Sequence, residues 1–87
     1  MHYDFVDWDH EDDANGNTRH IAHNGVTQEE FMEILDNARE RDIKPSRSSG
    51  RPSVSGETSE GRELFIVFER TKQAGMILIR PITAYDA

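Results

Sequence analysis

Two hydrophobic stretches near the C-terminus constrain the fold of this 87-residue chain more than any other feature. Residues 63–70 read ELFIVFER, and residues 75–82 read GMILIRPI. Side chains alternate between the two faces of a strand, and in both stretches apolar residues fall on both faces. This pattern predicts strands with little exposure to solvent. Residues 72–75 have the length and composition of a hairpin loop. The sequence therefore predicts a hairpin that supplies most of the core, with Pro81 at an edge or a bulge and a looser ladder beyond it.

The segment NTRHIAHNGVTQEE, residues 17–30, carries a helix-ending and then a helix-starting signal. Asn24 and Gly25 tolerate the left-handed backbone that commonly ends a helix. Thr27 and Glu30 have the spacing of a capping box, in which each side chain accepts the backbone amide of the other residue. The segment therefore predicts the joint between two helices.

The rest of the chain completes an α+β pattern. Residues 3–9 mix aromatic and acidic residues and predict a short strand. One helix is expected over residues 10–23, weakened near Gly16, and a second over residues 28–40, where apolar residues recur at helical spacing. Residues 44–61 hold six Ser, three Gly and two Pro, which predicts a loop with a short edge strand. The expected order is β-α-α-β-β-β, a small antiparallel sheet with two helices on one face.

Charge is distributed unevenly along this single expected domain, residues 1–87. The net charge is −7, but residues 1–40 carry eleven acidic and two basic side chains, whereas residues 41–87 carry six acidic and eight basic ones. A surface that binds an anion is therefore expected in the second half, unless both sets are ordinary solvated charges. The absence of cysteine, of a signal-like start and of a long apolar run predicts a cytoplasmic protein without a membrane partner.

Four segments, taken in order, resemble the BrnT-type toxins of bacterial type II toxin–antitoxin pairs. DFVDWD resembles the family's opening aromatic-Trp-Asp strand, and NTRHIAHNGVTQEE resembles its helix–Gly-Val–Thr/Ser-x-Glu-Glu joint. GETSEGRELFIVFER resembles its Gly-x-Thr-x-x-Gly-Arg turn before a hydrophobic strand, and ILIRPITAYDA resembles its Arg-x-Ile-(Ser/Thr)-Ala ending. Four such pieces in the family's order are much harder to obtain by chance than any one of them.

The resemblance implies a RelE-like fold and a metal-independent endoribonuclease that needs no cofactor. The partners it implies are an RNA substrate and a cognate antitoxin protein. The resemblance implies contact with DNA only through the antitoxin complex, and it allows the chain to form a homodimer. In such a reaction the ribose 2′-OH attacks the neighbouring phosphorus. This chemistry needs groups that take and give protons, and cations around the phosphorane.

Five residues are candidates for these catalytic roles. His20 and His23 lie one helical turn apart and could share the proton transfers. Alternatively, His23 could cap the end of a helix and His20 could be a half-exposed surface residue. Arg62, Arg70 and Arg80 lie in or beside the two hydrophobic strands, and guanidinium groups suit phosphate oxygens. Because Arg62 and Arg70 are eight residues apart, they can share one face of a strand. Ion pairing with acidic residues is the alternative role for these arginines.

Further residues are candidates for contacts with RNA. Arg47 and Arg51, in the Ser-rich segment, could follow an RNA backbone, or could be solvated loop charges. Tyr85 and Trp8 could stack on bases, although core packing is the better expectation for Trp8. No dense spacing of histidines and carboxylates predicts a metal site.

The competing hypothesis is a toxin-fold protein without catalysis, which binds another polypeptide or a second copy of itself. The net charge of −7 favours it, because ribonuclease toxins tend to be basic. Two departures from the family also favour this hypothesis. Asn24 occupies a position where the family commonly has His, and the sequence ends at Ala87, where the family continues into a helix.

Overall fold

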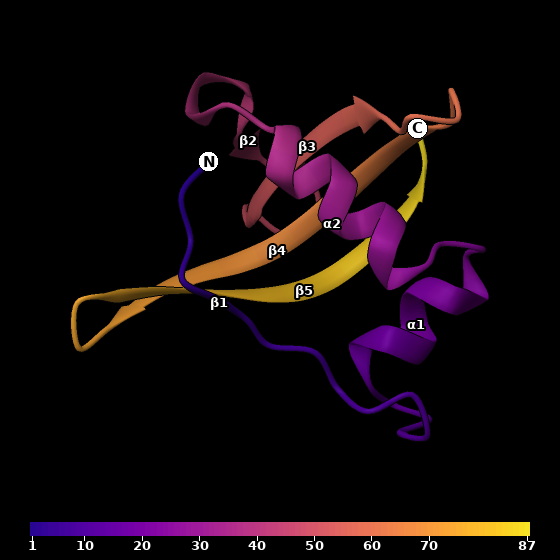
Figure 1. Ribbon diagram of the computed structural model, residues 1–87, viewed down its shortest axis with the longest axis horizontal. Helices are drawn as coiled ribbons and strands as arrows, with labels where there is room; N and C mark the ends of the chain where they lie inside the picture. The colour runs from indigo at the N-terminus through magenta and orange to yellow at the C-terminus, as the bar shows by residue number, and fades with distance from the viewer.

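A computed structural model describes all residues 1–87 and shows two helices with a five-stranded mixed sheet (Figure 1). The elements in chain order are β1 (Phe5–Val6), α1 (Asn17–His23), α2 (Gln28–Asn37), a 3₁₀ helix η1 (Glu40–Asp42), β2 (Lys44–Pro45), β3 (Pro52–Glu57), β4 (Glu63–Gln73) and β5 (Met76–Asp86). The strand order across the sheet is β1-β5-β4-β3-β2. The predicted α+β class is therefore confirmed.

Strands β4 and β5 are the predicted hairpin, and they form the middle of the sheet. Ala74 and Gly75 connect them with φ angles of 49° and 79°, which the two-residue turn of a tight hairpin requires. The register then shifts so that Ile82 has no partner on β4, which places Pro81 beside a bulge as predicted. Pairing resumes after the bulge as far as Asp86, so the expectation of a looser ladder beyond Pro81 is wrong.

The sheet is not purely antiparallel, because β1 pairs in parallel with β5. Phe5 lies opposite Leu78, and Val6 lies opposite Ile79. The strand expected over residues 3–9 is only two residues long, because the chain leaves the edge of β5 to enter α1. At the other edge β2 pairs outside β3, so the strand predicted in the Ser-rich segment is not an edge strand.

The first helix begins later than predicted, and the second begins where predicted. The acidic segment ahead of Asn17 forms turns, because Gly16 interrupts the helix. At the start of α1 the Asp9 carboxylate accepts a hydrogen bond from the backbone N–H of Asn17 at 2.8 Å. Helix α2 starts at the predicted capping box, in which Thr27 and Glu30 bind each other's amides. It ends three residues earlier than expected, and η1 follows.

Both helices bury their apolar side chains against one face of the sheet. In Figure 1, α2 crosses in front of β3 and β4, and α1 lies beside the C-terminal half of β5. The shared core is formed by Ile21, Phe31, Ile34 and Leu35 of the helices with Val54, Leu64, Ile66, Phe68, Ile79 and Ala84 of the sheet. Because side chains alternate along a strand, the residues between these point to the other side, which no helix covers. We call this side, marked by Ser53, Phe65, Val67, Thr83 and Tyr85, the open face.

The N-terminal segment is held to α2 by Tyr3, whose hydroxyl donates to the Asp36 carboxylate. This hydrogen bond raises the pKa of Tyr3 to about 12. Since the pKa is raised in the folded state, the bond stabilises the fold fully below the unfolded value of about 10 and is lost as the pH rises through about 12. We expect a titration of tyrosinate absorbance to show a step near pH 12 that Tyr3→Phe removes. A Tyr3 that ionises near pH 10 would contradict this contact.

Candidate functional site

The three strand arginines do not form the shared cationic surface that the ribonuclease hypothesis expects. Each binds carboxylates instead, in the pairs Arg62 with Glu30 and Asp86, Arg70 with Glu40, and Arg80 with Asp7 and Asp9. Arg62 and Arg70 share the helix-covered side, where they reach α2 and η1, whereas Arg80 binds the segment between β1 and α1. The expected cluster is therefore wrong, and ion pairing, the alternative role, is what the structure has.

Arg62 joins the helical joint to the ends of β4 and β5. Its Nε lies 2.8 Å from the Asp86 carboxylate, and its NH1 donates to the Gly25 carbonyl at 2.7 Å and to Glu30 at 3.1 Å. The hydrogen bond from Arg62 lowers the pKa of Asp86. The pKa of Glu30 is also lowered, first by the Thr27 amide and then by Arg62. These contacts give Arg62 a structural role.

The guanidinium group of Arg70 lacks hydrogen-bond partners for two of its three nitrogens. NH1 is 3.2 Å from Glu40, whose side chain is 63% exposed, while Nε and NH2 are buried without a hydrogen-bond partner. Buried donors without partners cost free energy, and removing this arginine leaves Glu40 in solvent. We therefore expect Arg70→Met to keep the free energy of unfolding or to raise it by about 1 kcal/mol, measured by urea denaturation. A loss of more than about 1 kcal/mol would show that Arg70 stabilises the fold.

Arg80 belongs to a polar cluster at the start of α1, formed by Asp7, Asp9, Asn17 and Arg80, which we call the Asn17 cluster. NH1 and NH2 of Arg80 donate to the two Asp9 oxygens at 2.9 and 2.7 Å. This hydrogen bonding lowers the pKa of Asp9 and raises that of Arg80. Gly16 is required beside it, because a Cβ there would lie 2.5 Å from the Asp9 Cβ.

Three polar residues in and directly after α1, Asn17, His20 and Asn24, form a stripe along the edge of β5. This is the part of the β5 edge beyond its short pairing with β1. The Asn17 amide group donates to the Pro81 carbonyl at 3.0 Å, and the Asn24 amide group donates to the Ala84 carbonyl at the same distance. Between them, Nε2 of His20 lies 3.0 Å from Oγ1 of Thr83. The stripe therefore satisfies carbonyl groups of the strand edge and fixes His20 beside it.

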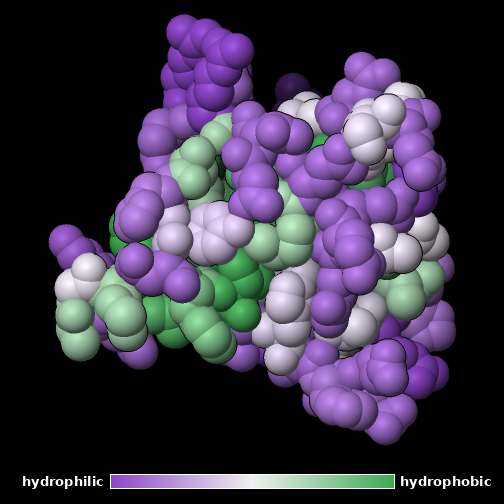
Figure 2. Space-filling view, viewed as in Figure 1, coloured by the Kyte–Doolittle hydropathy of each residue, from purple (hydrophilic) through white to green (hydrophobic).

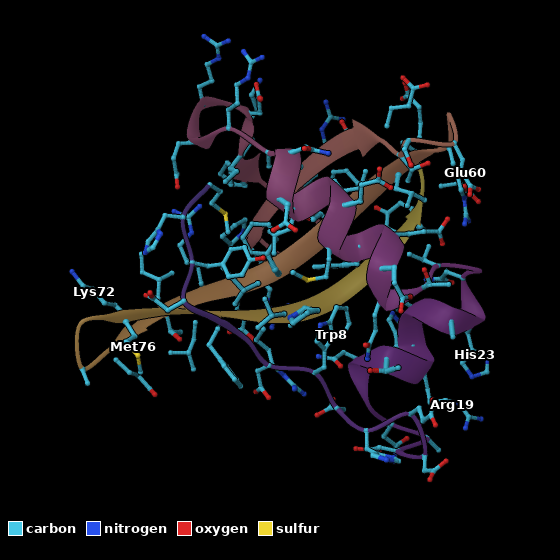
Figure 3. All side chains as sticks on the ribbon, viewed as in Figure 1. Trp8, Arg19, His23, Glu60, Lys72 and Met76 are labelled. Carbon is cyan, nitrogen blue, oxygen red and sulfur yellow. The ribbon has the colours of Figure 1, made fainter.

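The two candidate histidines are separated by this arrangement. His20 is exposed to solvent but contacts Thr83, whereas His23 projects from the outer side of α1 (Figure 3). A cleft of about 450 Å³ opens beside His20, and Asn17, Arg80 and Thr83 also line it. Of the five catalytic candidates, the structure thus brings His20 and Arg80 together and leaves His23, Arg62 and Arg70 elsewhere.

A second hollow, of about 440 Å³, lies on the open face under the loop between β2 and β3. We call it the hairpin groove; Lys44, Arg47, Phe65 and Tyr85 line it, together with serines. The Phe65 and Tyr85 rings are tilted by 46° with centroids 5.3 Å apart, and Tyr85 is 44% exposed. Figure 2 shows the opposite, helix-covered side of the molecule, on which hydrophilic residues surround a smaller group of hydrophobic ones. Lys44 and Arg47 form no ion pair.

Two of the three predicted RNA contacts, Arg47 and Tyr85, therefore line one groove. The third, Arg51, lies 3.8 Å from Glu69 in an exposed ion pair. Trp8 packs edge-on against Phe31, with ring centroids 5.2 Å apart, which confirms the expectation of core packing.

The sequence reading missed Asn17, Lys44, Phe65 and Thr83. The alternation of β4 could have pointed to Phe65, because it places this residue opposite the buried Leu64 and Ile66. The contact of Thr83 with His20 depends on the bulge at Ile82 and on the docking of α1, and neither can be read from local sequence.

Neither helix is long and apolar enough to span a membrane. Comparisons with protein-family models, with curated proteins and with solved structures give no match. The resemblance to BrnT-type toxins therefore stays a prediction from the sequence motifs.

Proposed function

We propose that the chain is the toxin of a type II toxin–antitoxin pair and cleaves RNA without a metal, with a RelE-like fold and its active site in the cleft beside His20. The observation that carries the proposal is that His20 and Arg80, sixty residues apart, line one solvent-open cleft next to the open face. Arg47 and Tyr85, the candidates for RNA contacts, line a groove on that same face.

In the proposed reaction the ribose 2′ oxygen forms a bond to phosphorus while the bond from phosphorus to the 5′ oxygen breaks. His20 takes the 2′-OH proton, and the departing 5′ oxygen takes a proton from solvent. Arg80, which Asp9 positions, donates an N–H group to a phosphate oxygen. The products are a 2′,3′-cyclic phosphate and a 5′-hydroxyl, and no cofactor takes part.

Digestion of single-stranded RNA by the purified protein in EDTA tests this function. We expect fragments that end in 2′,3′-cyclic phosphate, because the ribose itself supplies the nucleophile. RNA that stays intact at micromolar protein concentrations would exclude the ribonuclease.

A specific observation favours a second function, that of a non-catalytic toxin-fold module which binds a polypeptide. Every arginine of the predicted catalytic set has a carboxylate partner, and only one histidine reaches the cleft. Such a module would need no free cations, and its acidic surface would suit a basic partner. Expression in a bacterium without an antitoxin separates the two functions, since a ribonuclease toxin arrests growth and a binding module is tolerated.

A further inference from the structure

We propose that the hairpin groove is a nucleobase subsite for single-stranded RNA, in which a base stacks on Tyr85 and Lys44 and Arg47 hold the adjoining phosphates. The inference rests on the proposed function, because it supplies the substrate-holding site for the cleft at His20.

The aromatic pair gives the groove a flat apolar surface within a polar rim. Phe65 lies 5.3 Å from Tyr85, centroid to centroid, and supports its ring from the adjacent strand. Tyr85 keeps 44% of its surface exposed although it follows directly after the buried Ala84. An exposed aromatic ring on a sheet is suited to an unpaired base, which presents its flat face, whereas the bases of a duplex are already stacked.

Lys44 and Arg47 differ from four arginines in or beside the strands in having no carboxylate partner; Lys72, at the far hairpin tip, has none either. The four paired arginines are Arg51, Arg62, Arg70 and Arg80. Residues 39–51 carry five basic and two acidic side chains in a chain of net charge −7. A polyanion is therefore attracted to this segment in preference to the rest of the surface.

The combination of rings and cations selects a nucleic acid over an acidic peptide. Lys44 and Arg47 alone would attract either ligand, but a chain of carboxylates has no aromatic ring to stack on Tyr85. Of the serines that line the groove, Ser48 is exposed, and its hydroxyl can bind ribose or phosphate oxygens.

The groove lies next to the cleft along the same strand. Tyr85 lines the groove, Thr83 lines the cleft, and both project from the open face of β5 about 7 Å apart along the strand. An RNA strand whose base stacks on Tyr85 can therefore continue along β5 and present its next phosphate to His20.

Binding of a single-stranded 2′-O-methyl oligonucleotide, followed by fluorescence anisotropy, tests the subsite. This probe lacks the 2′-OH nucleophile, so its binding is independent of cleavage. We expect Tyr85→Ala to weaken binding about tenfold and Tyr85→Phe to restore it, because the ring and not the hydroxyl stacks. Lys44→Gln and Arg47→Gln should each weaken binding and lower the slope of log K against log salt by about one.

The controls lie at the far hairpin tip, where Figure 3 shows Lys72 and Met76. Lys72→Gln and Met76→Ala remove an equivalent charge and an equivalent apolar side chain and should leave binding unchanged. Equal losses in the groove and control variants, equal binding of a duplex, or displacement by a polyglutamate peptide at comparable concentration would overturn the subsite. Groove-dependent binding without cleavage of RNA would keep the subsite and remove the ribonuclease. Cleavage of RNA with a KM that Tyr85→Ala leaves unchanged would keep the ribonuclease and remove the subsite.

Discussion

Asn17→Ala is expected to lower the free energy of unfolding by about 3 kcal/mol, which corresponds to a fall in Tm of about 12 to 24 °C for a chain of this size. The Asn17 side chain accepts the Asp9 amide at 2.9 Å and donates to the carbonyls of Asp7 and Pro81 at 3.1 and 3.0 Å. It is only 6% exposed, so water cannot replace these bonds without opening the structure. Thermal unfolding followed by circular dichroism measures the change.

Asn15→Ala is the matched control, because Asn15 is exposed two residues away and its side chain makes no hydrogen bond. The free energy of unfolding of this variant should lie within about 0.5 kcal/mol of that of the parent chain. If Asn17→Ala were as mild as its control, α1 would not depend on the Asn17 cluster. The Asn17 cluster would then not hold in place the residues that line the cleft at His20.

His20→Gln is expected to slow RNA cleavage about a hundredfold or more. Glutamine retains a donor and acceptor for Thr83, so the stripe between α1 and β5 can remain, but it cannot exchange a proton near neutral pH. Initial rates in EDTA at saturating RNA measure the effect, and an unchanged Tm shows that the fold is intact.

His23→Gln provides the comparison on the same helix. His23 projects to solvent away from the cleft, so the cleavage rate should stay within about twofold of the parent rate. Equal losses in the two variants would place the chemistry outside the cleft. Retention of full activity by His20→Gln would leave His20 as a purely structural residue of α1.

Local signals in the sequence predicted the parts of the fold that local chemistry determines. The capping box of Thr27 and Glu30 starts α2 where expected, and a hairpin joins the two long strands as predicted. Its turn is only residues 74–75, shorter than the predicted loop 72–75, because β4 extends to Gln73. The first strand and helix were predicted too long, because the aromatic and acidic residues of segment 3–13 suit either element. Their actual limits depend on where β5 and Asp9 lie in space.

The site was harder to predict, because charged residues find their partners only in the folded chain. The even spacing of Arg62 and Arg70 correctly placed them on one side, but it could not show that helices carrying Glu30 and Glu40 cover that side. Likewise, Arg80 was chosen for its strand, while the acid that binds it, Asp9, lies seventy-one residues earlier. Arg47 and Tyr85 were chosen for their chemistry, and the groove that joins them forms only once β2 and β3 pair.

The central claim, that the open face is the RNA-binding surface, is tested most directly by an amide NMR titration with the 2′-O-methyl oligonucleotide. We predict that the largest shift changes fall on Lys44, Arg47, Phe65, Thr83 and Tyr85, and extend to His20. Residues of α2, on the opposite side of the sheet, should be unaffected. Shift changes confined to α2, or no changes at millimolar oligonucleotide, would contradict the account.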